Sequence, residues 1–485
     1  MFSVRDDDPF IVFRKLQDIA RKSQGEDVID LSRGDPGYGF TPSVRGREFG
    51  SYVLFLDSAL NGYDRVNKSS RLKLIEKITK EIYQPEVAER LLNMLREFID
   101  EVIDSSKYEG RKWDDEIILQ ELFGNCAMSG GSYLNPKGQE ITRVIVSAWH
   151  RNEYGVDIVS DDLLLTNGAS HAIGTVFKAL GEEGCGYLKS GDTAMIASPV
   201  YSPYNRILDE RRIKTIAFSM NHLNGDITIK NPLSAKVMIL IDPNNPTGFS
   251  LKQNDIEKLA TLAKERNMLV ITDEVYSSFF AKKKNMLALI PERTIAINAR
   301  SKVERSTGLR FGEIIVLPDG RKNISKMLGL KDPNALEQLL VFAKGPGRAG
   351  GQFQHTTFVP GPSQLLGMAH VVLGKKERDK YMSDLSENRA IFCDSLSLKS
   401  EGNTYYIIFD LDSLPGCNTH NISMEERLTK LAEAGLVYIP AYRFFSEEDR
   451  KKPGVLTSVR ASVVNTTPDR LKEAAERTKR ILCGT

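Results

Sequence analysis

The sequence predicts an α/β protein whose large domain holds a mostly parallel sheet of the seven-stranded type, covered by helices. Three observations predict this class: short apolar runs alternate with helical segments from about residue 140 to 320, the stretch before them shows only helical periodicity, and the last hundred residues mix both patterns. At 485 residues the chain is too long for one ordinary core. We expect a smaller α+β domain from residues 1–43 and 376–485, a helical insertion over 44–130 and the large domain over 131–375.

Six apolar runs have the composition of buried strands. Between two of them, residues 253–267 place Ile256, Leu259 and Ala263 on one helical face. Strands separated by helices form parallel sheets covered on both faces, and such sheets bind ligands beyond their strand ends. The predicted strands are residues 163–165, 193–197, 237–241, 269–272, 294–297 and 313–317.

The segment 44–130 carries two apolar stripes at helical spacing, one through Leu72, Ile75 and Ile78 and the other after Pro85. A packing role is the simpler expectation for both helices. Near the C-terminus the pattern predicts a strand over 404–410 and helices over 423–434 and 468–482.

Composition excludes several classes of function. Lys and Arg number 66 against 64 Asp and Glu, a net charge of +2, so no global charge favours nucleic acid or anionic lipid. The N-terminus lacks the apolar segment of a signal peptide, and no apolar run approaches the roughly 18 to 20 residues that span a bilayer. The cysteines lie far apart and form no C-x-x-C pair, so neither a metal site nor a disulfide framework is expected. The sequence thus predicts a soluble cytoplasmic protein. The five cysteines are Cys126, Cys185, Cys393, Cys417 and Cys483.

Polar residues of unusual type follow several predicted strands. Gly168 and Ser170 open a helix and offer backbone N–H groups and a hydroxyl to a phosphate, although an ordinary helix cap has the same pattern. Tyr201 presents a flat ring at a strand end or packs in the core. The turn DPNNPTG holds Asn245 in a fixed direction. Asp273 ends an apolar strand, where a carboxylate needs a partner, and a protonated ring nitrogen would serve.

The stretch NARSKVERSTGLRFG, residues 298–312, places Lys302 between two predicted strands and follows it with Arg310. A surface lysine is the simpler interpretation. A lysine held inward at a strand end, however, can have a pKa low enough for its amine to attack an aldehyde.

Together these residues resemble pyridoxal-phosphate-dependent enzymes of fold type I, in the class I/II aminotransferase group. Each motif is weak alone, but their joint order along most of the chain is specific. The motifs are GDPGYGFTP at 34–42, Y-x4-G at 133–138, GAS at 168–170, PVY at 199–201, PNNPTG at 243–248, DEVY at 273–276, SK-x7-R at 301–310 and RAS at 460–462.

The resemblance implies roles for the residues that hold and activate the cofactor, pyridoxal 5'-phosphate. Lys302 forms the Schiff base with the cofactor and later moves a proton to and from the substrate Cα. Arg310 clamps the phosphate with two parallel hydrogen bonds, beside Ser170 and the N–H groups near Ala169. Asp273 keeps the pyridine nitrogen protonated, which makes the ring an electron sink.

Further roles concern the ring and the substrate. By the same resemblance, Asn245 and Tyr276 hydrogen-bond the phenolic oxygen of the cofactor, and Tyr201 stacks on its ring. Arg460 binds the substrate α-carboxylate, and Gly34 lines the substrate site.

The resemblance also implies a homodimer, because the tyrosine at the position of Tyr133 reaches the phosphate of the neighbouring subunit. Two residues depart from the family pattern. Ala299 replaces a serine that often contacts the phosphate, and Asp242 replaces the first asparagine of N-P-x-N-P-T-G. Neither change removes a catalytic role.

The length of the insertion, RGDP at 33–36 and QHTTFVPGPSQ at 354–364 are similar to the aspartate 4-decarboxylase branch, whose members also transaminate aspartate. A dicarboxylate substrate needs a second cation, for which Arg33 and Arg348 are the candidates. His355 can order a water or a carboxylate, or serve only a structural hydrogen bond.

The sequence therefore predicts an aminotransferase that passes the amino group of an acidic, aspartate-like amino acid to a 2-oxo acid. The first alternative is an aspartate 4-decarboxylase that gives alanine and carbon dioxide. The second is a non-catalytic cofactor-binding regulator, against which residues 1–130 show no basic DNA-binding pattern.

Overall fold

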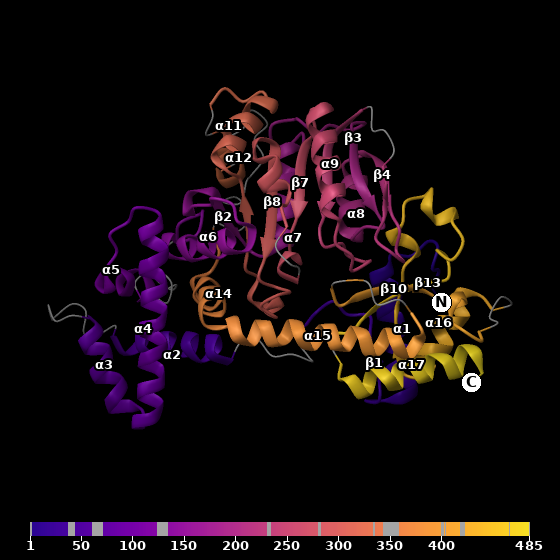
Figure 1. Ribbon diagram of the computed structural model, residues 1–485, viewed down its shortest axis with the longest axis horizontal. Helices are drawn as coiled ribbons and strands as arrows, with labels where there is room; N and C mark the ends of the chain where they lie inside the picture. The colour runs from indigo at the N-terminus through magenta and orange to yellow at the C-terminus, as the bar shows by residue number, and fades with distance from the viewer. Residues whose placement is uncertain are drawn as a thin grey trace. The chain divides into compact units, whose positions relative to one another are not determined.

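The computed structural model describes residues 2–36, 44–60, 71–123, 134–229, 234–279, 283–332, 335–342, 358–398, 402, 404–417, 422–464 and 466–484. The chain divides into two compact units (Figure 1). Unit 1 comprises Met1–Phe40, Leu188–Ala281 and Lys380–Thr485, and unit 2 comprises Thr41–Tyr187 and Lys282–Asp379. The domain boundaries drawn from the sequence stay a prediction.

Five of the described strands of unit 1 lie side by side in the order β7-β6-β3-β4-β5. The first four are parallel, and β5 runs antiparallel to β4. Strands β6 and β7 are buried along almost their whole length, as continuous apolar runs between covering helices must be. Helix α8 packs against β4. The bounds are β3 (Thr193–Ser198), α8 (Ser202–Glu210), β4 (Lys214–Met220), β5 (Ile227–Thr228), β6 (Ala235–Ile241), α9 (Gln253–Glu265) and β7 (Leu269–Asp273).

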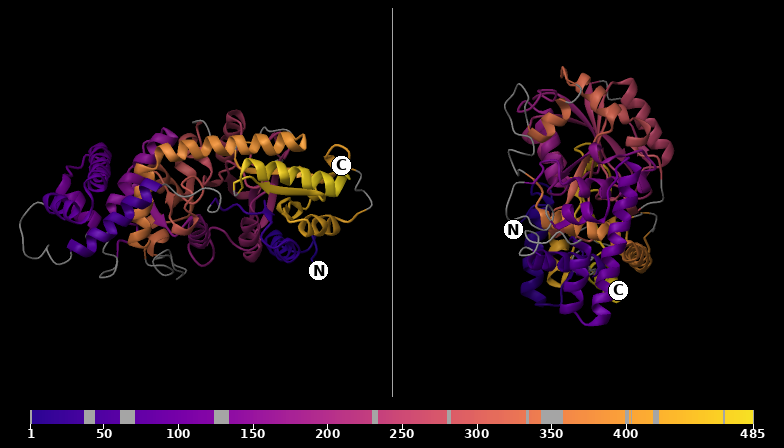
Figure 2. Two further views of the ribbon diagram at one scale, coloured as in Figure 1. Left: turned by 90° about the horizontal axis from the view of Figure 1, so that it is seen from below. Right: turned by 90° about the vertical axis from the view of Figure 1, so that its left-hand side faces the viewer.

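The rest of unit 1 joins segments from both ends of the sequence. β1 pairs with β11 in parallel, β13 lies between β10 and β12, and α1 packs against α16 (Figures 1 and 2). Asp27 binds Arg470 at 2.7 Å and Arg477 at 2.6 Å. The bounds are α1 (Pro9–Gln24), β1 (Ile29–Asp30), α15 (Lys375–Leu396, which begins in unit 2), β10 (Tyr406–Asp410), α16 (Met424–Glu433), β11 (Leu436–Val437), β12 (Ile439–Pro440), β13 (Ser458–Ser462) and α17 (Pro468–Cys483).

The described residues of unit 2 form three strands in the order β2-β9-β8, and β9 is antiparallel to both neighbours. All six predicted strands are present, and the α/β class is confirmed. The strand directions are mixed. With β4 and the two-residue β5, which were not predicted, the described strands that the two units place in these orders number eight. The bounds are α6 (Glu140–Tyr154), β2 (Leu163–Thr166), α7 (Ala169–Leu180), α10 (Met286–Leu289), β8 (Thr294–Ala299), β9 (Gly312–Ile315), α11 (Pro318–Met327), α12 (Ala335–Phe342) and α14 (Gly361–Leu373).

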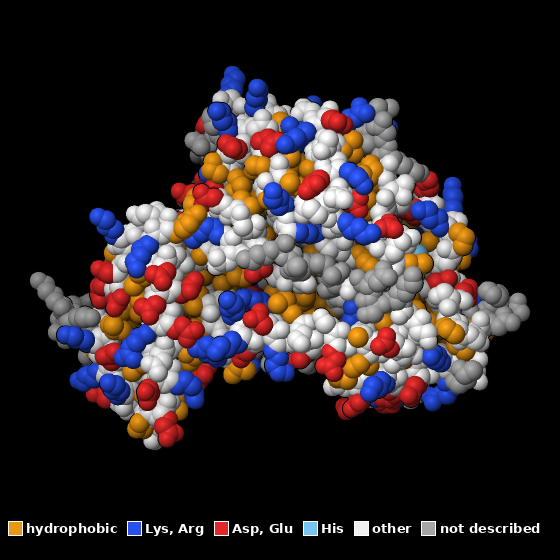
Figure 3. Space-filling model, in the orientation of Figure 1, with side chains coloured by type: hydrophobic (Ala, Val, Ile, Leu, Met, Phe, Trp, Pro, Cys, Tyr) orange, Lys and Arg blue, Asp and Glu red, His pale blue; other side chains and the backbone are white. Residues whose placement is uncertain are grey.

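The segment predicted as an insertion folds as four described helices, α2 (Val44–Leu60), α3 (Arg71–Ile82), α4 (Pro85–Tyr108) and α5 (Asp115–Gln120). Their apolar faces share a core with α6 and α14, in which the rings of Phe49 and Phe98 stack at 5.0 Å. Outward-facing charges of both signs alternate over α3 and α4, with Arg96 bound to Glu76 at 2.7 Å (Figure 3). Within the described ranges, no helix has the length and apolar character to cross a membrane.

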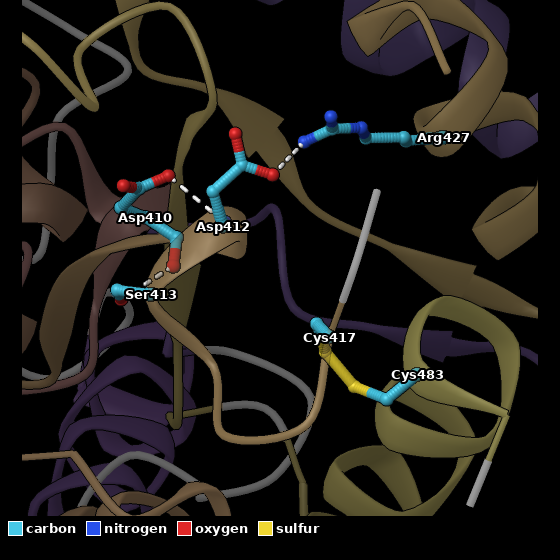
Figure 4. Close-up of a disulfide and its surroundings, with 6 residues drawn as sticks. All are labelled: Asp410, Asp412, Ser413, Cys417, Arg427 and Cys483. Carbon is cyan, nitrogen blue, oxygen red and sulfur yellow. Dashed lines mark hydrogen bonds and ion pairs between the residues drawn. A yellow bond between two sulfur atoms is a disulfide. The ribbon is translucent and has the colours of Figure 1, made fainter. Parts of the chain in front are cut away.

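The expectation of no disulfide is wrong, because Cys417 and Cys483 are bonded (Figure 4). Their Cα atoms lie 4.0 Å apart although 66 positions separate them in sequence. Cys417 follows the short turn after β10, and Cys483 ends α17. Spacing along the chain detects only local cysteine pairs, so the packing of α17 was needed to find this one. Cys185 and Cys393 are free.

Removing this disulfide should destabilise unit 1. Closing a loop of 66 residues restricts the unfolded chain, and loops of this size typically stabilise by roughly 2–4 kcal/mol. We expect Cys483→Ser to lower the free energy of unfolding by that amount in urea titrations under non-reducing conditions. Cys185→Ser is the matched control and should leave it unchanged. Alkylation of both Cys417 and Cys483 in the native, unreduced protein would contradict the disulfide.

Candidate active site

In unit 2, Arg310 lies against the N-terminus of α7. Gly168 precedes that helix with φ +81°, and a Cβ at Gly168 would meet Nη2 of Arg310 at 2.5 Å. Only glycine therefore allows this approach. The guanidinium donates to the carbonyls of Thr307 at 2.8 Å and Asn167 at 3.3 Å, and no carboxylate pairs with it among the described residues. Because the first turn of a helix leaves N–H groups without an intrahelical acceptor, this corner attracts an anion.

Lys302 is half-buried in the turn that follows β8, three residues beyond Ala299. The turn is held by its own backbone and by one hydroxyl. The N–H of Arg305 donates to the carbonyl of Lys302 at 3.3 Å, and Oγ of Ser306 donates to the carbonyl of Arg300 at 2.9 Å. The predicted lysine is thus on a defined turn next to β8.

Sequence reasoning missed a buried ionic cluster at the base of this turn. Nη2 of Arg300 binds Oε1 of Glu313 at 2.5 Å, and the same oxygen lies 2.8 Å from Nε2 of His150. The Arg300 guanidinium also lies over the ring of Trp149, 3.7 Å from its centroid. The cluster joins α6, β8 and β9. The signal was an arginine two residues before Lys302 and a glutamate inside an apolar run.

The charges of this cluster follow from its burial. Burial lowers the pKa of His150 to about 4, against the opposing pull of Glu313, so the imidazole is neutral at pH 7. Burial alone would raise the pKa of Glu313, but Arg300 and His150 outweigh it and hold that pKa below its ordinary value. The cluster is therefore a carboxylate paired with a guanidinium and hydrogen-bonded to a neutral histidine.

In unit 1, Asp273 ends β7 with its carboxylate buried. Oδ2 accepts a hydrogen bond from the hydroxyl of Tyr204 at 2.9 Å, and Oδ1 accepts one from the N–H of Val275 at 3.3 Å. Burial, and then Asp273, raise the pKa of Tyr204 far above its ordinary value, so the hydroxyl stays protonated and donates. Sequence reasoning named Asp273 but missed Tyr204, three residues after Tyr201.

Asn245 and Tyr276, which the sequence predicted to act together, do lie together. Nδ2 of Asn245 donates to the Tyr276 hydroxyl at 3.4 Å, and that hydroxyl is 3.2 Å from the hydroxyl of Tyr406. Burial, followed by Tyr406, raises the pKa of Tyr276 well above the usual value. Tyr406, on β10, was not predicted as a site residue.

Arg460 is almost fully buried at 1% exposure on β13. Nη1 donates to Oδ1 of Asn245 at 3.1 Å, and Nη2 donates to the carbonyl of Ser32 at 2.7 Å. The guanidinium lies 4.4 Å from the centroid of the Tyr406 ring. Nε has no acceptor, and no carboxylate pairs with Arg460 in the part of the chain that the structure describes.

The remaining predicted site residues either have other contacts in the structure or lie outside its described part. Arg33 forms an ion pair with Asp30 at 3.0 Å. Gly34 has its carbonyl 3.2 Å from the Tyr405 hydroxyl. Tyr201 precedes α8 and meets the ring of Phe10 edge to face at 6.1 Å. Tyr133, Arg348 and His355 lie outside the described residues.

Comparison with known proteins now decides the family. The family model described as aminotransferase class I and II matches residues 127–477. The chain belongs to this family. An aspartate aminotransferase of Pyrococcus horikoshii is 27% identical over 260 residues, which cover 50% of this chain and 65% of that protein. A bifunctional aspartate aminotransferase and L-aspartate beta-decarboxylase of a Pseudomonas species is 28% identical over 171 residues, which cover 33% and 32%.

Among solved structures, an aminotransferase from Mycobacterium tuberculosis matches 100% of both chains with a TM-score of 0.65 at 17% identity, which shows the shared fold. The sequence matches cover less than two thirds of the two curated relatives. The family is nonetheless the one that the motifs predicted.

Class I and II aminotransferases depend on pyridoxal phosphate. The described residues fit this cofactor at two places. In unit 2, Arg310 at the start of α7 offers a cationic cradle that a side chain at position 168 would fill. In unit 1, the buried Asp273 carboxylate at the end of β7 offers an acceptor for a protonated ring nitrogen.

The ionic cluster formed by Arg300, Glu313 and His150 gives a direct test of stability. Glu313→Gln keeps the side-chain volume but leaves Arg300 as a buried cation, which should cost roughly 3–5 kcal/mol in the free energy of unfolding. Glu292→Gln, which removes a carboxylate that is 32% exposed beside Arg293 in the same unit, should cost under about 1 kcal/mol.

Replacing both charges, with Arg300→Met and Glu313→Gln together, should recover most of the lost stability because no buried charge then stays unpaired. Chemical denaturation followed by circular dichroism measures all three variants. Equal losses in Glu313→Gln and Glu292→Gln would contradict the account of the cluster.

Proposed function

We propose that this protein is a pyridoxal-phosphate-dependent aminotransferase that moves the amino group of an acidic, aspartate-like amino acid to a 2-oxo acid. The observation that carries the proposal is the Arg460 guanidinium. It is buried, it contacts a carbonyl, an amide oxygen and an aromatic face, and no described carboxylate neutralises it. A preformed cation of this kind suits the α-carboxylate common to all amino acid substrates, which it can bind through two parallel hydrogen bonds.

The cofactor, when bound, supplies an aldehyde that links to amines and a ring that accepts electrons from the substrate Cα. Around it we assign roles to residues of this chain. Arg310, the N–H groups near Ala169 and the Ser170 hydroxyl hold the phosphate. Asp273 holds a proton on the ring nitrogen and is itself oriented by Tyr204.

Asn245 and Tyr276 hold the phenolic oxygen. Their hydroxyl and amide already form one hydrogen-bonded group with Tyr406, so the donors are in place before the cofactor arrives. Tyr201 covers the ring face. Because this group is fixed by contacts within unit 1, its orientation costs little at the moment of binding.

Lys302 has the central chemical role. Its Nζ would hold the cofactor through the cofactor aldehyde, and as a free amine it would take the proton from the substrate Cα and release it to a carbon of the cofactor. The reaction then runs in two halves, with the first product leaving before the 2-oxo acid binds. The Arg300–Glu313 pair supports this lysine by fixing the turn that carries it.

Support for an acidic substrate comes from the relatives named as aspartate aminotransferases. A second carboxylate requires a second cation, and Arg33 is the candidate within the described residues. Its ion pair with Asp30 leaves 29% of the side chain exposed, so a substrate can compete for it. Gly34 then lines the substrate. Arg348 stays the alternative cation, and a homodimer that shares Tyr133 between subunits is part of the proposal.

Replacing Lys302 by alanine should abolish turnover, because no other described residue is assigned its covalent and proton-moving roles. Reduction with borohydride followed by peptide mass analysis should find the cofactor on Lys302 in the wild type and on no residue in the variant. The variant should still retain cofactor in its absorbance spectrum through Arg310 and Asp273.

Lys326→Ala, on the exposed surface of α11, is the matched control and should keep both activity and the reducible link. Full activity in Lys302→Ala would rule out the assignment of the lysine.

The substrate is tested by incubating the cofactor-loaded protein with L-aspartate, with and without 2-oxoglutarate, and assaying glutamate, alanine and carbon dioxide together. We expect glutamate only when the oxo acid is present, and no alanine. Alanine and carbon dioxide without an acceptor would assign the protein to β-decarboxylation, the second activity named for the Pseudomonas relative. No product in either case would contradict an aspartate-like substrate while leaving the Lys302 test independent.

A further inference from the structure

Unit 1 contains a cavity of about 200 Å³ that none of the roles above uses. It lies between α15, the start of β10 and the segment after β7. Apolar side chains of Phe279, Met382 and Leu385 form one part of its wall, and Ser386, Arg389 and Thr404 form the polar part. Arg389 is the only charged side chain among the described residues that line it.

Arg389 is 5% exposed, and its hydrogen bonds use only one edge of the guanidinium. Nη1 donates to the carbonyl of Thr404 at 2.9 Å and to that of Tyr406 at 2.5 Å. Nε has no acceptor, and no carboxylate pairs with Arg389 within the described ranges. Burial lowers the pKa of Arg389 to about 10, yet the side chain is still cationic at pH 7.

A buried cation without a counter-charge is costly, and proteins usually pair it. Here the missing partner would have to come from the cavity side, since the two carbonyls already occupy the other side. Gly402 also lines the cavity and lies against the guanidinium without a side chain, because a Cβ there would meet Nη2 of Arg389 at 2.1 Å.

We propose that this cavity binds a small carboxylate with an apolar body, whose charge pairs with Arg389 and whose body packs on Phe279, Met382 and Leu385. A single guanidinium matches one carboxylate, whereas a phosphate would need more donors than the described wall offers. The size agrees, since a cavity of about 150 Å³ holds benzene. The cavity does not include Arg460, and the argument for it does not rest on the proposed reaction.

Occupancy would act on the strand that carries Tyr406. The same guanidinium holds the carbonyls of Thr404 and Tyr406, and the Tyr406 ring lies against Arg460. A carboxylate that fixes Arg389 would therefore stiffen the start of β10.

Benzoate is the probe, titrated calorimetrically into the full-length protein beside its neutral analogue benzyl alcohol. Ser386→Phe places a ring at the cavity from an exposed position of α15 and leaves the hydrogen bonds of Arg389 untouched. Ser383→Phe, exposed on the same helix but not lining the cavity, is the matched control. Since Arg460 can also bind benzoate, the difference between these two variants reports the cavity alone.

We expect Ser383→Phe to bind one more benzoate per chain than Ser386→Phe, or to bind it at least about tenfold more tightly, and benzyl alcohol to bind at least about tenfold more weakly than benzoate. Identical isotherms for the two variants, or no benzoate binding up to about 10 mM, would overturn the proposal. Glu401→Gln is titrated as well, because Glu401 precedes Gly402 in the sequence. Benzoate binding that appears only in Glu401→Gln would mean that the Glu401 carboxylate occupies the cavity, and it would also overturn the proposal.

Discussion

The carboxylate of Glu313 is the contact on which the arrangement of unit 2 depends. It is fully buried on β9, binds Arg300 beyond the end of β8 and His150 on α6, and thereby joins three elements around one oxygen. A buried ion pair rarely adds much stability over an apolar replacement, but its loss on one side is severe. Its value here is geometric. Lys302 follows Arg300 by two residues. The buried ion pair of Arg300 with Glu313 therefore holds the turn on which the covalent chemistry is proposed to occur.

Unit 1 differs, because its buried Arg460 guanidinium has no carboxylate partner among the described residues and contacts neutral groups instead. The Tyr276 and Tyr406 hydroxyls and the Asn245 amide satisfy one another, and Arg460 rests on an aromatic face and a carbonyl. Such contacts keep a guanidinium buried without neutralising it. Donors held in this way can bind a carboxylate with little reorganisation, which is the property that a substrate-binding cation needs.

Much of this was accessible from the sequence because the signals were local. Each predicted strand was a largely apolar run, Asp273 followed such a run directly, and Asn245 lay in the turn after another. Tyr204 and Tyr406 escaped prediction because their roles arise from contacts between segments that lie far apart in sequence, and the Arg300–Glu313 pair because Glu313 was counted as part of a predicted strand. Tyr204, for example, reaches Asp273 across 69 positions. The disulfide between Cys417 and Cys483, 66 positions apart, escaped prediction for the same reason. Glu313 also shows that a charged residue inside an apolar run can be one half of a buried ion pair.

The pairing of β1 with β11 affects how the chain folds during its synthesis on the ribosome. Ile29 pairs with Leu436, Asp27 is held by Arg470 and Arg477, and α1 packs against α16, so these early segments depend on residues that follow much later in the sequence. Domains ordinarily fold as they emerge, N-terminal first. Residues 9–30 therefore leave the ribosome well before residues 424–477, and they remain without these partners while the intervening chain is synthesised. The apolar face of α1, with Val12, Leu16 and Ala20, is therefore a natural target for chaperones during synthesis.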